Sequence, residues 1–334
     1  MKVVDVYCGI GGFSAGALLA DHEVVLGIDN CPNVLKCFAA NTKADARCLT
    51  LPATVVWPTG NDMHFHFSPP CTALSRARAG QASAEQVGYG LAHVKWALNS
   101  VIEENFKSFS LETVSVPATR ALIQTFKERF PSTIEFDTFE CADFGVPQTR
   151  KRIFVGRPEM IKRLQSVPVS ARVSVRDVFT ELPANFFKNT TVQRGGKGCI
   201  RSVEEPGFTV CGARSLSWCD STGKTFKCMT ARELAVIQTL PPEWRLPTRK
   251  RDATLAVGNS VPSEMAREVC RAAAGDASLT QISEPVSGTS KRLHSEAFMS
   301  LETRIAALEA HILAYRHTSM AYFENDIHFS FTIH

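Results

Sequence analysis

The sequence predicts an α/β fold built on a doubly wound parallel sheet. Near the start of the chain, short apolar runs typical of buried strands alternate with stretches of helical periodicity. The strand-like runs cover residues 3–7, 24–28 and 63–67, and the helical stretches cover 13–19 and 34–40. Strands that alternate with helices form a parallel sheet, which binds ligands at the carboxyl ends of its strands.

The same alternation continues to about residue 156. Helices are predicted at residues 94–102 and 119–129, and strands at 109–116, 134–139 and 152–156. The pattern loosens over 157–228, where glycine, serine, threonine and basic residues gather, and helices return at 231–238 and 262–274. We therefore predict a core at 1–156, an inserted region at 157–228 and a return to the core at 229–274.

The end of the chain has a different composition. Residues 275–291 are polar and poor in large apolar groups, which is typical of a linker. Residues 292–334 form the predicted C-terminal extension, in which apolar residues recur at alternating spacings of three and four over 293–316. A short coiled coil of about three heptads, which would give a homo-oligomer, and an amphipathic helix packed on its own core both fit this spacing.

The composition is that of a soluble globular protein. Hydrophobic residues make up 44% of the 334 and charged residues 21%, with a net charge of +4, which permits a nucleic-acid partner without requiring one. The eleven cysteines have neither C-x-x-C pairs nor histidines at zinc spacing, so no metal site is predicted. With no signal peptide and no apolar run of the ~20 residues that span a bilayer, we expect an intracellular protein with free thiols, in cytoplasm or nucleus and not in a membrane.

A glycine-rich loop follows the first predicted strand. Gly9, Gly11 and Gly12 would let the backbone approach a ligand where a side chain would clash. Asp29 ends the second strand, where a carboxylate can accept hydrogen bonds from both ribose hydroxyls of an adenosine. Each feature alone is also typical of an ordinary turn or a solvated strand end, but together they indicate a nucleotide-like cofactor.

Three further positions carry candidate chemistry. Cys71 follows Pro69 and Pro70 at the end of the third strand, and a thiolate held there could act as a nucleophile, although most lone cysteines are buried hydrophobes. Glu112 lies on an otherwise apolar strand, where a carboxylate must be paired or functional. Arg150 and Arg152 share one face of a later strand, which would otherwise be a basic surface strand.

These segments resemble, in order and spacing, the motifs of the cytosine-C5 methyltransferase family, which uses S-adenosylmethionine (AdoMet). The likeness covers roughly residues 3–274 and leaves only the tail outside. Six segments carry it: residues 4–14 (VDVYCGIGGFS), 68–71 (SPPC), 111–114 (LETV), 143–152 (DFGVPQTRKR), 229–241 (with MTARE and IQTLP) and 258–262 (GNSVP).

The resemblance implies a Rossmann-like AdoMet-binding core and a reaction that yields 5-methylcytosine in double-stranded DNA. Cys71 would add to C6 of a cytosine flipped out of the duplex, and Glu112 would hold N3 and the exocyclic amine. Arg152, with Arg150, would steady the C2 carbonyl and the nucleophile loop. Residues 157–228 would be the target-recognition region. The implied cofactor-binding residues are Tyr7, Gly9, Gly11, Gly12, Phe13 (against the adenine), Asp29, Asn259 and Val261.

The chain departs from the family's pattern at three places. Thr72 follows the nucleophile where the family usually has Gln, and Thr113 replaces an Asn that tends to support the nucleophile loop. Residues 49–51 (LTL) stand where the family normally supplies an Asp near the adenine, and Asp45 is nearby but poorly aligned. These departures bear on efficiency more than on the type of reaction.

Two alternatives remain open at this point. One branch of the family methylates transfer RNA and shares the Ser-Pro-Pro-Cys motif, so RNA is the rival substrate. A degenerate homologue that binds AdoMet or DNA without turnover is the second, although Cys71, Glu112 and the two arginines are retained. A dehydrogenase interpretation of the glycine loop explains none of the later motifs.

Overall fold

In the computed structural model, residues 1–72, 74, 83–189, 199–212 and 216–275 are described. The predicted linker and helical extension beyond Gly275 lie outside these residues. The main sheet has seven strands, and β7 is antiparallel to both of its neighbours. Its order is β3 (Asp45–Cys48), β2 (Glu23–Asp29), β1 (Lys2–Val6), β4 (Met63–Phe67), β5 (Phe109–Val114), β7 (Lys151–Gly156) and β6 (Glu135–Glu140).

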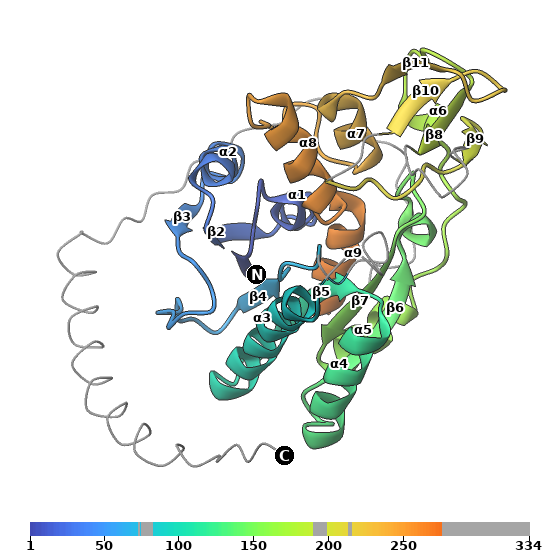
Figure 1. Cartoon of the computed structure of the whole chain (residues 1–334). Coiled ribbons are helices and arrows are strands. Elements are labelled where there is room, and N and C mark those ends of the chain that lie inside the picture. The colour runs from blue at the N-terminus through green and yellow to red at the C-terminus, as the bar shows by residue number, and fades with distance from the viewer. Residues whose placement is uncertain (73, 75–82, 190–198, 213–215, 276–334) are drawn as a thin grey trace, which may run out of the picture. The chain divides into compact units, whose positions relative to one another are not determined.

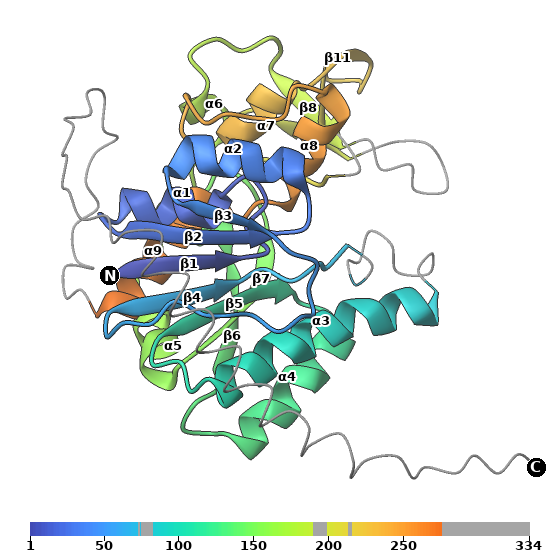
Figure 2. The same ribbon diagram turned by 90° about the vertical axis from the view of Figure 1, so that its left-hand side faces the viewer.

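Helices cover both faces of this sheet, as the predicted doubly wound fold requires (Figures 1 and 2). One face carries α1 (Gly12–Leu19), α2 (Pro32–Thr42), α5 (Pro158–Gln165) and α9 (Ser263–Ala274). The other face carries α3 (Ala84–Glu103) and α4 (Pro117–Arg129). Side chains point to alternate faces along a strand. Val3 of β1 therefore packs with the helices of the first face, and Val4 packs with those of the second.

The last helix of the core packs against the first. A Cβ added to Gly16 of α1 would lie 2.4 Å from the Ala266 Cβ of α9 and 2.4 Å from the Ser263 carbonyl oxygen. Only glycine therefore allows α1 and α9 to approach this closely. The return to the core that the sequence predicted for 229–274 begins with α7 (Ala231–Ile237), continues through α8 (Lys250–Asn259) and ends in α9.

A second, antiparallel sheet is formed by four short strands within the region where the sequence pattern loosens (Figure 1). The order is β11 (Thr225–Cys228), β10 (Leu216–Cys219), β8 (Phe186–Asn189) and β9 (Ile200–Ser202). Its core contains Phe187 and Trp218, and α6 (Val175–Val178) lies in the same cluster. The helix α5, although it lies within residues 157–228, packs with α9 in the core of the large sheet.

Several elements were not predicted. The edge strand β3 and the helices α5 and α8 were not predicted, and α3 begins at Ala84, ten residues before the predicted start at residue 94. A capping box explains that start, since the Ser83 hydroxyl accepts from the Gln86 amide and the Gln86 side chain accepts from the Ser83 amide. The 3-10 turn η2 (Cys141–Phe144) leads into β7 and was also missed.

Candidate active site

A cavity of about 590 Å³ opens at the carboxyl ends of β1, β2, β4 and β5. This is the size of an ordinary small-molecule site. Most of the predicted site residues line it: Tyr7, Gly9, Gly12, Phe13, Asp29, Cys71, Glu112, Arg150, Arg152, Asn259 and Val261. The parallel strands bring together segments that are more than two hundred residues apart in sequence.

Asp29 and the glycine loop form one end of the cavity. The Gly9 amide donates to Asp29 Oδ2 at 3.0 Å, and the Cys31 amide donates to Asp29 Oδ1 at 2.9 Å. These bonds hold the carboxylate in place and leave further lone pairs on both oxygens. Gly9 has a φ of +54°, and a Cβ added there would meet nothing within 4 Å, so its backbone borders open space.

The other two glycines of the loop serve packing. Gly11 has a φ of +87°, and a Cβ added there would lie 3.1 Å from the Phe38 ring and 3.3 Å from the Trp244 ring. Gly11 is therefore turned toward these rings, and it is not among the described residues that line the cavity. Gly12 lines the cavity, but an added Cβ would lie 2.5 Å from the Val261 carbonyl oxygen. Gly12 thus lets the last motif lie against the first.

Two aromatic side chains of the first motif are held by histidines. Phe13 stacks on His66 with the ring centroids 3.4 Å apart and the planes 1° from parallel, and it is only 2% exposed. Tyr7 adopts a left-handed φ of 63°, and its hydroxyl lies 2.9 Å from Nδ1 of His93. Such a conformation is strained in a bulky residue and is typical of functional sites. Burial raises the pKa of the Tyr7 phenol, so the hydroxyl stays protonated.

Cys71 lies partly exposed at the other end of the same cavity. Burial raises the pKa of its thiol and the Glu112 carboxylate adds to this effect, whereas Arg152 and Arg150 lower it. The resting side chain is therefore a thiol. All eleven cysteines lie in the described residues and are free.

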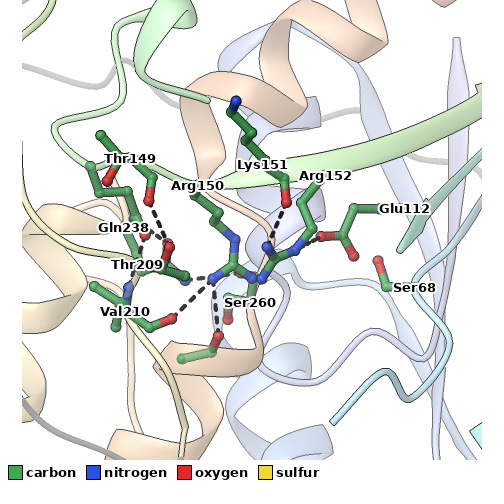
Figure 3. Close-up of polar contacts among 12 residues, drawn as sticks. Ser68, Glu112, Thr149, Arg150, Lys151, Arg152, Thr209, Val210, Gln238 and Ser260 are labelled. Atoms are coloured by element: carbon green, nitrogen blue, oxygen red, sulfur yellow. Dashed lines mark hydrogen bonds and ion pairs between the residues drawn. The ribbon is translucent and has the colours of Figure 1, made fainter. Parts of the chain in front are cut away.

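Glu112 and Arg152 form a buried ion pair beside Cys71. Arg152 Nε lies 2.8 Å from Glu112 Oε1, and the two side chains are 12% and 6% exposed (Figure 3). Antiparallel pairing of β5 with β7 brings them to the same end of the sheet. Arg152 also donates from Nη1 to the Lys151 carbonyl oxygen at 2.8 Å, which fixes the guanidinium against the carboxylate.

Arg150 points elsewhere, although it lies only two residues before Arg152. Its Nη1 donates to the carbonyl oxygens of Val210 at 3.0 Å and Gly258 at 3.4 Å, and its Nη2 donates to that of Ser260 at 3.2 Å (Figure 3). Gln148 acts in the same way, since it accepts from the Val210 amide at 3.0 Å and donates to the Ile237 carbonyl oxygen at 3.0 Å. Both residues tie the last two motifs to the second sheet's region.

The departures from the family's pattern have clear places in the structure. Thr113 is fully buried, and its hydroxyl has no hydrogen-bond partner among the residues that the structure describes. Thr113 therefore does not support the nucleophile loop as the family's usual Asn tends to do. Leu49 and Leu51 line the cavity, whereas Asp45 is absent from its described lining. This part of the cavity wall is therefore apolar. Thr72 is exposed and lines the cavity beside Cys71.

Several lining residues were not predicted from the sequence. Tyr89 and His93 come from α3, which carries no family motif, and Asp252 and Leu255 come from the part of α8 that precedes the last motif. Tyr89 is 58% exposed, with its ring 4.4 Å from that of His93. The i, i+4 spacing of Tyr89 and His93 on a helix could have indicated a shared face.

The chain matches the family model of the C-5 cytosine-specific DNA methylases over residues 1–157 and 175–274. The chain belongs to this family. It is thus a DNA cytosine-C5 methyltransferase, an enzyme that methylates C5 of cytosine in DNA.

Two type II methyltransferases align with most of the methyltransferase. The type II methyltransferase M.HgiDI of Herpetosiphon aurantiacus is 25% identical over 288 residues, which cover 80% of this chain and 92% of that protein. M.HindV of Haemophilus influenzae is 24% identical over 305 residues, covering 81% and 96%.

Solved structures agree with the fold. A mutant DNMT2 of Spodoptera frugiperda superposes with a TM-score of 0.56 at 16% identity, covering 81% of this chain and 98% of that one. The Entamoeba histolytica methyltransferase EhMeth gives 0.58 at 11% identity, covering 83% and 98%. In the part of the methyltransferase that the structure describes, no helix is both long and apolar enough to cross a membrane.

Proposed function

We propose that the methyltransferase draws a cytosine out of double-stranded DNA into the cavity and attacks it with Cys71. The observation that carries this proposal is the juxtaposition of Cys71 with the Glu112–Arg152 ion pair in the cavity that Asp29 and Gly9 also border. Flipping a base out of the duplex takes a few kcal/mol, which contacts to its Watson–Crick edge can offset.

The residues that border the glycine loop fit AdoMet. The free lone pairs of Asp29 suit the two ribose hydroxyls, and Leu49 and Leu51 offer an apolar wall to the adenine. Asn259 and Val261 close the same end of the cavity. Bound there, AdoMet supplies the methyl group that C5 accepts.

The chain's own groups account for the activation of the base. The Cys71 thiol loses its proton to water, the thiolate forms a bond to C6, and the electrons of the C5–C6 double bond move to C5. Glu112 holds N3 and the exocyclic amine, and it favours protonation of N3 as negative charge develops on the ring. Arg152 orients Glu112 and lies within electrostatic reach of the thiol, whose pKa it lowers. After methylation, C5 loses its proton to water, the electrons of that C–H bond re-form the C5–C6 double bond, and the sulfur–C6 bond breaks to release the thiolate.

We assign Arg150 a positioning role instead of a contact with the base. Its guanidinium donates to three backbone carbonyl oxygens, so it holds the loops at residues 210 and 258–260 in place. The second sheet, within residues 157–228, is the proposed target-recognition region, because it lies outside the chemistry and carries exposed basic and aromatic side chains.

Methyl transfer from radiolabelled AdoMet to mixed genomic DNA and, in parallel, to total RNA tests the proposal. We expect label in DNA, read by sequencing as 5-methylcytosine, and a loss of roughly 10⁴-fold or more in Cys71→Ala. Cys48→Ala, which removes an exposed thiol outside the cavity lining, is the matched control and should keep the wild-type rate. Label in RNA alone would contradict the proposal and indicate that the substrate is RNA.

A duplex with 5-fluorocytosine tests the covalent step. Because fluorine at C5 cannot leave as a proton does, the bond between Cys71 and C6 should persist, and mass spectrometry should find the adduct on Cys71. Failure to form this adduct in any sequence context, with AdoMet bound, would overturn the nucleophilic role of Cys71.

A further inference from the structure

Five polar side chains form a continuous chain of hydrogen bonds through the centre of the large sheet. The His64 imidazole lies 2.8 Å from Ser108 Oγ and 2.9 Å from Ser110 Oγ, and the His66 imidazole lies 2.8 Å from Ser110 Oγ and 2.7 Å from Ser68 Oγ. His64, His66 and Ser110 are completely buried. The arrangement follows from strand geometry, since alternate residues of the parallel neighbours β4 and β5 share a face.

The protonation states of the imidazoles and hydroxyls in this chain of hydrogen bonds are constrained. Burial lowers the pKa of His64 to about 3 and that of His66 well below its usual range, so both rings are neutral. A neutral imidazole has one N–H and one acceptor nitrogen, and the Ser110 hydroxyl has a single proton for the two rings it joins. If Ser110 donates to one ring, it must accept from the other. With Ser110 donating to one ring, all four hydrogen bonds run in one direction, either toward Ser68 or away from it.

This chain of hydrogen bonds ends at the cavity that contains Cys71. Ser68 lines the cavity and begins the segment that carries Cys71, and Figure 3 shows its hydroxyl on the side of Glu112 away from Arg152. His66 also stacks on Phe13, which lines the cavity near the glycine loop. A buried imidazole thus contacts both ends of the site, at a position on the strand where an apolar side chain would pack without hydrogen-bond requirements.

We propose that Ser68 is a further positioning residue for methyl transfer, and that His66 holds its hydroxyl so that the Ser68–Cys71 segment stays in one conformation. Pro69 and Pro70 have fixed φ angles, so the orientation of Ser68 is passed on to Cys71 with little slack. The inference rests on the proposed role of Cys71 as nucleophile. It adds the group that aims this nucleophile, and misplacement by about 1 Å can lower a rate ~100-fold.

Four variants separate the effect of the Ser68 hydroxyl from the effect of side-chain packing. Ser68→Ala removes the hydroxyl and Ser68→Thr keeps it. His66→Phe keeps a ring to stack on Phe13 but removes the bond to Ser68, and His64→Phe is the same change two residues away from the cavity end. We expect Ser68→Ala and His66→Phe to lower the single-turnover methyl-transfer rate ~10–100-fold, with Ser68→Thr and His64→Phe within about threefold of wild type. The Kd for AdoMet should stay within about twofold throughout, because Phe13 keeps its partner ring.

Alkylation of Cys71 by iodoacetamide in the DNA-free protein gives a readout that does not depend on activity. A loosened segment exposes the thiol, so alkylation should be roughly fivefold faster in Ser68→Ala and His66→Phe and unchanged in Ser68→Thr. The buried Cys8, Cys141 and Cys270 serve as internal references for global loosening.

The outcomes divide cleanly. Wild-type alkylation in Ser68→Ala, or equal impairment of Ser68→Thr and Ser68→Ala, overturns the positioning role. Equal effects of His64→Phe and His66→Phe would mean that the strand, and not the link to Ser68, is affected. A wild-type protein that never labels DNA defeats the proposed function, while the alkylation series still decides whether Ser68 orders the segment. If His66→Phe does not fold, the two Ser68 variants decide alone.

Discussion

The two sheets of the methyltransferase differ in how many of their strands are fully buried, although each has an exposed edge strand, β3 and β11. In the large sheet, the central strands β4 and β5 are buried at every position, whereas in the small sheet only β10 is, and β9 has no fully buried residue. The large sheet holds the cavity at its strand ends, where rigid elements fix Cys71, Glu112 and Asp29. The small sheet depends on a few anchors such as Trp218. The proposed recognition region depends on a core cluster that also contains Ile10 and Ala15, and how far its stability is separate from that of the cavity can be tested.

Trp218→Ala should have the largest effect. The Trp218 ring is fully buried against Phe179, and its indole N–H donates to Glu233 at 2.9 Å. We expect the small sheet to lose about 4 kcal/mol of stability. Hydrogen exchange over residues 186–228 should speed up and DNA methylation should fall, while AdoMet binding stays within about twofold. Phe226→Ala on β11, with the ring 62% exposed, is the control and should leave hydrogen exchange unchanged. If Trp218→Ala lowered the affinity for AdoMet as much as it lowers DNA methylation, the two sheets would unfold as one unit.

Arg150→Ala should come next, because this side chain joins the two regions. Its removal leaves the buried carbonyl oxygens of Val210, Gly258 and Ser260 without this donor, which should lower the free energy of unfolding by about 3 kcal/mol. Arg152→Ala is the matched comparison, because Arg152 lies in β7 and Arg150 immediately precedes this strand. Arg152→Ala should lower the methyl-transfer rate, and it should shift the denaturant midpoint less than Arg150→Ala does. The reverse pattern would exchange the roles that we assign to the two arginines.

Asp5 should give the large sheet a pH dependence. Burial raises the pKa of Asp5 from 3.8 to about 7, with the Ser14 hydroxyl 2.6 Å away only partly opposing it. The folded chain therefore binds a proton that the unfolded chain releases. The stabilisation is complete below pH 3.8 and is lost as the pH rises through about 7. From pH 5 to pH 7 Asp5 alone should contribute a loss of roughly 2–3 kcal/mol, measured by denaturation as the difference between wild type and Asp5→Asn. The difference is needed because the buried His64 and His66, whose pKa values are lowered, add stability over the same range. Identical pH slopes for wild type and Asp5→Asn would refute the assignment.

Lys224→Ala should have the smallest effect, confined to DNA affinity. Lys224 is exposed next to β11, in the proposed recognition region. If it contacts a phosphate, its loss should weaken binding by about 1 kcal/mol and reduce the slope of log K against log salt by about 0.9. Lys95→Ala, on α3 and equally exposed, should leave both quantities unchanged. Equal effects of the two changes would mean that the small sheet has no special role in holding DNA.

The sequence predicted the large sheet better than the small one for a physical reason. Buried parallel strands appear as apolar runs, so β1, β2 and β4 were predicted nearly to the residue. The short strands β8 to β11 derive their pairing from distant partners, and no local pattern reports this. In the site, motif likeness predicted Cys71, Glu112 and Asp29 in one cavity. It could not show that Arg150 faces backbone carbonyls while Arg152 faces Glu112, because both share one face of a strand.

The contact of α1 with α9 through Gly16 has a consequence for how the protein is made. The helix that follows the glycine loop packs on residues synthesised some 250 positions later, so a partly synthesised chain lacks this contact. Ribosome-bound chains that end before Ser263 should remain dependent on chaperones. A gene split in the loop between β11 and α7 should yield two halves that bind AdoMet only after they have found each other.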